Sequence, residues 1–251
     1  MTEISYQNLA QTHNWEVRED ITAAHRRAWQ RLGQAGTWLT GAEKIAIARE
    51  TRAALDCQLC QDRKAALSPN AVQGNHDHTG QLSDLEVEQI HRIRTDPGRL
   101  SRGWFDGLHN DGMVEERYVE TVGVIANMVA IDTFTKGLGL DPWPLPDAQP
   151  GEPSRTRPPA KRQLAWVSTL APEDAIGTED ETLYGGGPTA PHIYQAMSLV
   201  PAEVRGFFDI AVSQYLPGAA MRDFDNEYRA INHAQIELVA GRVSALNQCV
   251  Y

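Results

Sequence analysis

The stretches that decide the fold are KIAIARETRAALDCQLC (Lys44–Cys60) and NHAQIELVAGRVSALNQCVY (Asn232–Tyr251). When Cys249 is laid on Cys57, alanines of the two stretches coincide. Apolar residues recur about every three to four positions in both, which is the period of an amphipathic helix. Each stretch therefore predicts a helix that leads to a cysteine.

Helical periodicity also dominates the rest of the chain. A Thr40/Glu43 pair and a Ser83/Glu86 pair have the spacing of capping boxes, which predicts a helix start at each. Strand-like alternation is almost absent, so we expect an all-α protein. The further predicted helices cover residues 21–32, 83–93, 101–108, 115–136, 190–199, 201–215 and 223–247.

Proline divides the chain into two helical parts. Ten of the 14 prolines lie between Pro142 and Pro191, and such a stretch can hold neither a helix nor a central strand. We predict a first helical repeat at 1–141, a proline-rich connector at 142–189 and a second repeat at 190–251. The helices at 44–56 and 234–248 are expected to superimpose as equivalent parts of a pseudo-symmetric pair.

Composition excludes several classes of function. The net charge of −10 argues against nucleic acid as a partner, because phosphate binding favours a basic surface. No apolar run is long enough to span a bilayer, and the N-terminus lacks the pattern of a signal peptide. Three cysteines are too few for a disulfide scaffold. We therefore expect a cytoplasmic protein without a membrane partner.

The motif that can carry chemistry is Cys57-Gln58-Leu59-Cys60. At a helix start, unpaired N–H groups stabilise a thiolate and lower the pKa of the first cysteine, and a second thiol one turn later can form a disulfide with it. We predict a reversible Cys57–Cys60 disulfide. The alternative is that the two cysteines are small buried residues without a reaction.

The Ala-rich predicted helix followed by this CxxC pair resembles the pattern of the carboxymuconolactone decarboxylase and AhpD-like alkylhydroperoxidase family. The segments LTGAEKIAIA…CQLC and SALNQCVY carry the resemblance. The segments YVETVGVIANMVAIDTF and PHIYQAMSLVPAEVR also resemble parts of those members that contain two fused copies. The resemblance implies an AhpD-like helical bundle that reduces a peroxide or a similar small electrophile with electrons from a thiol reductant. It also implies a homo-oligomer, which would be a dimer, trimer or hexamer.

The resemblance assigns Cys60 as the attacking thiol and Cys57 as the resolving one, whereas the helix-start argument favours Cys57 as the thiolate. The family usually has a glutamate twelve residues before the first cysteine and a histidine four residues after the second. This chain has Ile45 and Lys64 there. Lys64 can lower a thiol pKa by its charge but cannot relay a proton as histidine does.

Glu50, two helical turns before Cys57, can replace the missing acid. Its alternative role is a solvated helix acid paired with Arg49 or Arg52. In the second copy Glu237 stands twelve residues before Cys249, where the family has its acid. We therefore consider Glu237 and Cys249 as further catalytic candidates.

The position after Tyr251 is where a second cysteine would complete the motif. Relatives are known in which one of these two positions is selenocysteine. We hypothesise that the residue after Tyr251 is selenocysteine or cysteine, which would make Cys249 part of the main site. The nucleotide sequence past codon 251 tests this idea.

A second enzyme class would use a metal instead of a thiol. Glu88-Gln89-Ile90-His91 is an E-x-x-H on a predicted helix, and Glu120 on the long helix can add a carboxylate, as in di-metal carboxylate bundles. The loop His76-Asp77-His78 adds candidate ligands. The sequence disfavours a structural zinc site, because such a site needs four ligands and no second CxxC or CxxH pair follows.

A third class is a helical interaction protein without catalysis. No haem or flavin motif is present, and Gly185–Pro188 is not a phosphate loop because no Lys-Ser/Thr follows it. We therefore expect no cofactor.

Overall fold

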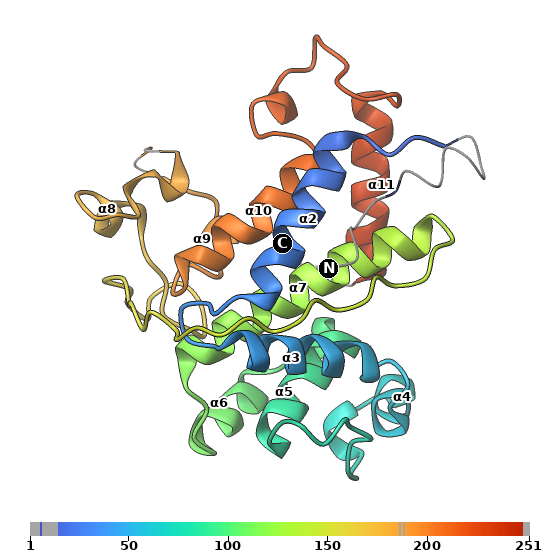
Figure 1. Cartoon of the computed structure of the whole chain (residues 1–251), viewed down its shortest axis with the longest axis vertical. Coiled ribbons are helices and arrows are strands. Elements are labelled where there is room, and N and C mark those ends of the chain that lie inside the picture. The colour runs from blue at the N-terminus through green and yellow to red at the C-terminus, as the bar shows by residue number, and fades with distance from the viewer. Residues whose placement is uncertain (1–5, 7–14, 186, 188, 248–251) are drawn as a thin grey trace.

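The computed structural model describes residues 6, 15–185, 187 and 189–247. Within these residues it is all-α, as predicted, and the one β-type pairing is an isolated bridge between Lys161 and Thr169. None of the described helices is both long and apolar enough to cross a membrane. At the centre of the molecule lie four helices: α2 (Glu19–Gly33), α3 (Gly41–Ala53), α7 (Glu115–Gly137) and α10 (Pro201–Gln214) (Figure 1).

Local signals start the helices where the sequence predicts. Thr40 and Glu43 form a complete capping box at α3, and Ser83 and Glu86 form one at α5 (Asp84–Thr95). Each box satisfies backbone N–H groups that a helix leaves without intrahelical partners. The long helix α7 covers the predicted 115–136 and ends at Gly137.

The main core lies where α2, α3, α5, α7 and α10 meet. Trp29 and Leu32 of α2 are buried in it, as the helical pattern of that segment predicts. Its other buried members are Tyr6, Ala28, Leu39, Ile45, Ile47, Ala48, Ile90, Val124, Ile125, Met128, Ile131, Trp143 and Ile210. A second core packs α6 (Arg102–Asn110) against the later part of the proline-rich connector and the residues after it, through Phe105, Leu108, Leu170 and Leu199.

The proline-rich connector has no helix through residue 160 and runs extended along the helical body. It is tied to that body: the Gln149 amide donates to the Gly33 carbonyl, and the Arg155 amide donates to the Thr37 carbonyl. Two short helical turns follow, α8 (Pro172–Ala175) and η3 (Glu181–Tyr184). The segment is therefore an arm bound to the surface of the helical body.

Beyond the connector, the predicted helices are shorter. The 190–199 segment holds only α9 (His192–Gln195), while α10 matches its prediction. The last described helix, α11, begins at His233 because Asn232 and Gln235 form a capping box there, so residues 223–232 are not part of it. It ends at Leu246.

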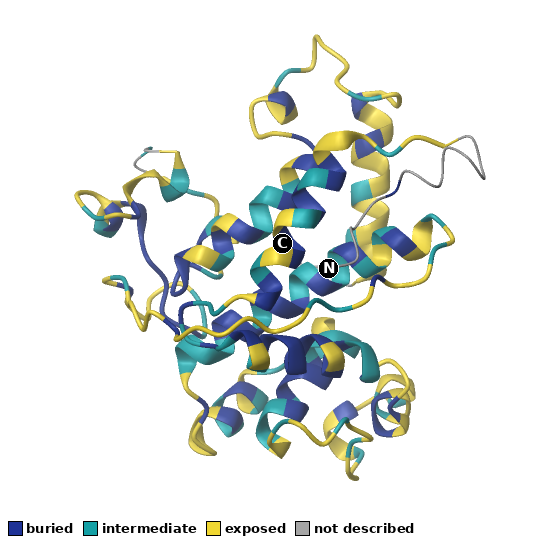
Figure 2. Cartoon of the chain, viewed as in Figure 1, coloured by how far each residue is buried: buried dark blue, intermediate teal, exposed yellow. Residues whose placement is uncertain are grey.

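The predicted equivalence of the helices at 44–56 and 234–248 is wrong. Helix α3 is central, packs against α2, α5 and α7, and has eight buried residues. In α11 only His233 and Ile236 are buried, and most of its surface is exposed (Figure 2). Because α10 packs on α2 and α7, the C-terminal part also shares the main core. The domain boundaries themselves stay a prediction.

Candidate metal centre

The two cysteines of the CxxC pair lie at the start of α4 (Gln58–Ala65), as predicted. Cys57 is the N-cap residue of this helix and Cys60 lies in its first turn. Their exposed fractions are 0% and 3%, and both are free thiols. The pair is therefore closed off from solvent in this conformation, and the predicted disulfide stays a prediction.

Two histidines complete the cluster. His76 comes from the loop between α4 and α5, and His91 comes from α5. His76 Nδ1 lies 3.4 Å from Cys57 Sγ and 3.5 Å from Cys60 Sγ, and His91 Nδ1 lies 3.2 Å from Cys60 Sγ. The two sulfurs and one nitrogen of each ring all lie within 4.8 Å of one another.

A carboxylate stands behind each imidazole ring. His91 Nε2 lies 2.7 Å from Glu50 Oε1, and His76 Nε2 lies 2.8 Å from Glu88 Oε2. These contacts assign the proton of each neutral ring to Nε2, because a carboxylate only accepts. Both Nδ1 atoms are then lone-pair donors that face the sulfurs.

The two carboxylates are themselves held in place. The second oxygen of Glu50 accepts from the Thr79 amide at 3.0 Å and from the Thr79 hydroxyl at 2.5 Å. Glu88 accepts from Arg63 at 2.8 Å and from the Trp104 indole at 3.0 Å. The network therefore ties the loop, α4, α5 and α6 to the ring orientations.

Further contacts fix the ends of α4. Asp77 accepts from the Gln58 amide at 2.9 Å, which satisfies a backbone donor at the start of the helix. At the other end, Arg99 donates to the carbonyls of Arg63, Lys64 and Ala66. The short helix is thus held by polar contacts at both ends.

Burial and charge set the protonation of the cluster without a cation. Burial, together with the neighbouring Cys57, raises the pKa of the Cys60 thiol to about 12. Burial also lowers the pKa of His91, against the opposing effect of Glu50. Although burial opposes it, hydrogen bonds from His76 and Arg63 lower the pKa of Glu88 to about 2. The metal-free cluster therefore holds a neutral Cys60 thiol and an ionised Glu88.

The geometry suits a tetrahedral cation. With Zn–S near 2.3 Å and Zn–N near 2.0 to 2.1 Å, a tetrahedron places sulfur and nitrogen about 3.6 Å apart. Three of the four sulfur–nitrogen distances are 3.2 to 3.5 Å, and the fourth, between Cys57 and His91, is within 4.8 Å. A cation would also lower the thiol pKa, since coordination deprotonates cysteine.

The structure places the predicted site residues as follows. Glu50 is fully buried behind His91, so its alternative as a solvated acid paired with Arg49 or Arg52 is wrong. Arg49 contacts Gln81, and Arg52 forms an ion pair with Asp132 instead.

The predicted metal set Glu88, His91 and Glu120 does not come together. Glu88 contacts His76 instead of pointing with His91 at a shared position. Glu120 lies in the bundle, where it accepts from the Trp38 amide at 2.5 Å. Glu88 lies three residues before His91 on the same helix, but this spacing does not determine which histidine ring its carboxylate contacts.

The second-copy candidates lie elsewhere. Glu237, on α11, accepts from the Tyr215 hydroxyl and lies 3.8 Å from His233. Cys249 and the proposal about the residue after Tyr251 fall outside the described residues.

Sequence reasoning considered His76 only as a loop ligand and disfavoured a Cys₂His₂ site. The four residues are a CxxC pair, one loop histidine and one helix histidine, and the two histidines lack the His-x₃₋₅-His spacing of the usual motif. The sequence does contain one signal for this site, because His76 and His91 both follow the CxxC pair.

Comparison of the chain with protein-family models, with curated proteins and with solved structures finds no match. The AhpD-like resemblance therefore rests on the quoted motifs, and the site is interpreted from its own geometry.

Proposed function

We propose that this protein binds one Zn²⁺ ion through Cys57, Cys60, His76 and His91, and that the ion fastens the α4–α5 segment to the helical bundle. The observation that carries the proposal is the convergence of two sulfurs and two nitrogens within 4.8 Å. Four protein donors leave no open position, which is the arrangement of structural zinc sites.

The carboxylates support the same proposal. Metal-bound histidines commonly donate their other N–H to a carboxylate, which fixes the ring and raises its basicity as a ligand. Here both histidines have such a partner, Glu50 and Glu88. A set of two soft thiolates and two imidazoles selects Zn²⁺ over Mg²⁺ or Ca²⁺, which favour oxygen ligands.

Metal analysis of the purified full chain tests the proposal. We expect about one Zn²⁺ per chain, and Cys60→Ser and His76→Ala should lose it. His78→Ala is the matched control, because His78 lies two residues from His76 in the same loop but is exposed and outside the cluster. Reconstitution with Co²⁺ should give the visible absorption of a thiolate-ligated tetrahedral ion. A protein that binds no Zn²⁺, or a His78→Ala variant that loses it equally, would contradict the proposal.

A second candidate is the thiol chemistry that the sequence suggests. Its supporting observation is the row Cys60, His91 and Glu50, in which an imidazole links a thiol to a carboxylate. In that reaction a Cys60 thiolate would attack a peroxide and become a sulfenic acid while an alcohol leaves. The Cys57 thiol would then displace water from this sulfur to form a disulfide, which an external thiol reduces.

Metal-free protein separates the two candidates. If thiol chemistry is the function, peroxide should convert the metal-free chain to a Cys57–Cys60 disulfide, and His91→Ala should slow this reaction. If zinc binding is the function, the zinc-loaded chain should resist peroxide, and His91→Ala should lose the metal. A zinc-free native protein with a fast-reacting Cys60 would favour the thiol chemistry.

A further inference from the structure

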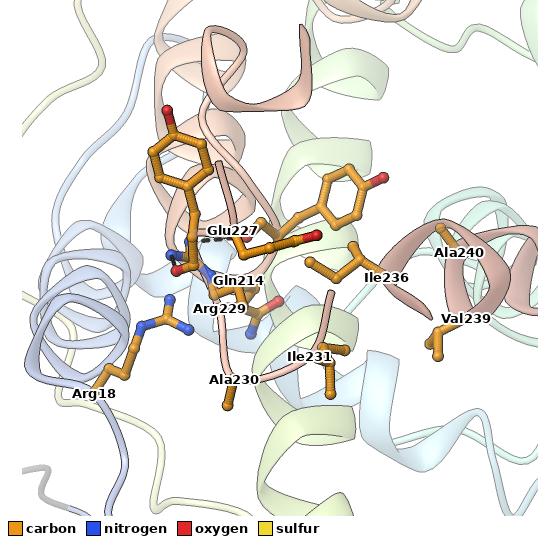
Figure 3. Close-up of a pocket in the computed structure, with 11 residues that line it drawn as sticks. Arg18, Gln214, Glu227, Arg229, Ala230, Ile231, Ile236, Val239 and Ala240 are labelled. Atoms are coloured by element: carbon orange, nitrogen blue, oxygen red, sulfur yellow. Dashed lines mark hydrogen bonds between the residues drawn. The ribbon is translucent and has the colours of Figure 1, made fainter. Parts of the chain in front are cut away.

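A cavity of about 690 Å³ lies between the end of α10, residues 227–231 and α11, and it shares no lining residue with the metal cluster (Figure 3). This volume is in the range of pockets that hold small organic ligands. The cavity has two chemically different ends, which restricts the ligand class.

One end of the cavity is apolar. In Figure 3, Ile231, Ile236, Val239 and Ala240 lie together on the side of α11. Residues 236, 239 and 240 share one face of α11 because they are three and four positions apart. This face can cover a hydrocarbon body.

The other end carries two guanidinium groups. Arg229 donates to the carbonyls of Tyr215 at 2.9 Å and Tyr228 at 3.0 Å, and its buried Nε has no hydrogen-bond partner. No carboxylate of a described residue lies within ion-pair distance of Arg229. Arg18 points toward it in Figure 3, and burial together with repulsion from Arg18 lowers the pKa of Arg229.

The acids nearby are already engaged. Asp20 forms an ion pair with Arg18 at 3.0 Å. Glu227 also lines the cavity, and one of its oxygens accepts from the His233 amide at 2.7 Å, so its charge lies at the start of α11. The charge on Arg229 is therefore balanced by backbone dipoles and not by a contacting carboxylate.

We propose that this pocket binds a small aliphatic monocarboxylate, with its carboxylate at Arg229 and its hydrocarbon chain along α11. A planar guanidinium and a carboxylate match in shape and form charge-assisted hydrogen bonds. Nη1 and Nη2 of Arg229 each carry a second hydrogen beyond the ones donated to the two carbonyls, and such a ligand can accept from these. Its negative charge also separates the two arginines electrostatically. Its chain would remove the exposed side chains of Val239 and Ile231 from water.

Calorimetric titration of the full chain with sodium octanoate tests the proposal. We expect saturable binding at one site, with octanol of the same chain length binding at least tenfold more weakly and octylammonium not competing. Arg229→Gln should weaken octanoate binding roughly tenfold to a hundredfold, since it removes a charge-assisted contact. Arg242→Gln is the matched control, because this exposed arginine of α11 lies outside the pocket.

A second pair of variants tests the apolar end and does not depend on Arg229. Val239→Asp should weaken the binding of octanoate at least tenfold, whereas Leu238→Asp on the neighbouring position should not. Both side chains are exposed, at 58% and 74%, so both variants should fold. Equal affinity for octanol and octanoate, equal effects of the two α11 variants, or no binding of octanoate would overturn the proposal.

Discussion

The central bundle and the α4–α5 segment are stabilised by different means. Fifteen of the described side chains are buried in the contiguous apolar core of the bundle. Around the cysteines, the described part of the chain forms a buried apolar cluster of only Cys57, Leu59 and Cys60, with Val72 packed against it. The difference teaches that one chain can combine a region that folds by apolar burial with a region that depends on directed polar contacts.

Helix α5 connects the two regions. Its Ile90 belongs to the bundle core, whereas Glu88 and His91 face the cysteine cluster. Apolar burial contributes about 25 cal/mol per Å² without regard to direction, whereas a hydrogen bond gives a net gain of only about 0.5 to 1.5 kcal/mol. We therefore expect a change in one region to affect the stability of that region and to leave the other region largely unchanged.

Removal of the proposed Zn²⁺ ion should give the largest effect. Zinc binding contributes roughly 10 to 16 kcal/mol to the folding of zinc-finger peptides. A chelator should therefore remove amide-exchange protection from residues 57–83 and leave α7 and α10 protected. Hydrogen exchange with mass spectrometry measures this, and equal loss of protection in both regions would show that the regions are not separate.

Truncation of a side chain in the bundle core should destabilise the bundle and leave the cysteine–histidine cluster unchanged. Ile131 is fully buried in the bundle core. Ile131→Ala should lower the free energy of unfolding by about 2 to 5 kcal/mol through lost burial and a cavity. Urea titration measures this change, with Val114→Ala at an exposed position as control. The zinc affinity of the folded variant should be unchanged, and a parallel loss of affinity would contradict the comparison.

The carboxylates behind the histidines should matter for metal affinity. Glu88→Gln and Glu50→Gln should each weaken Zn²⁺ binding about tenfold to a hundredfold, since they position the rings and tune their basicity. Competition with a chelating dye measures the affinity. Asp84→Asn is the control, because this exposed residue in the first turn of α5 is outside the network. Wild-type affinity in both Glu variants would show that the rings need no support.

The smallest effect concerns an acid in the bundle. Burial raises the pKa of Glu203 from 4.5 to about 7, against the attraction of Lys44. Between these two pKa values the folded state holds a proton on Glu203 that the unfolded state has lost. The contribution of this proton to the free energy of unfolding is therefore fully present below pH 4.5 and is lost as the pH rises through 7. Glu203→Gln should lack this decline and be more stable than wild type at pH 8 by about 1 to 3 kcal/mol.

Thermal unfolding at pH 4.5 and pH 8 checks the Glu203 prediction. The two proteins should have similar stability at the lower pH and differ at the higher one. Glu173→Gln, at an exposed position, should follow the wild type at both pH values. A difference of the same size at both pH values would show that the effect is not titration.

The helical architecture was predictable because its signals are local. Both predicted capping boxes exist, and the α7 pattern gives the right helix within one residue at its end. The buried α3 and the exposed α11 share a similar Ala- and Arg-rich spacing, yet they are not equivalent parts of a repeat. Periodicity identifies a helix but does not say what covers it.

The sequence alone determined that the protein is all-α, where most helices begin, and that Cys57 and Cys60 stand one turn apart at a helix start. Only the tertiary structure decided that His76 and His91 meet these sulfurs, and that Glu50 and Glu88 stand behind the rings. Caps and periodicity depend on residues a few positions apart, which the chain order fixes. The cluster of Cys57, Cys60, His76 and His91 joins a helix start, a loop and a second helix, and their meeting depends on how α3, α4 and α5 pack.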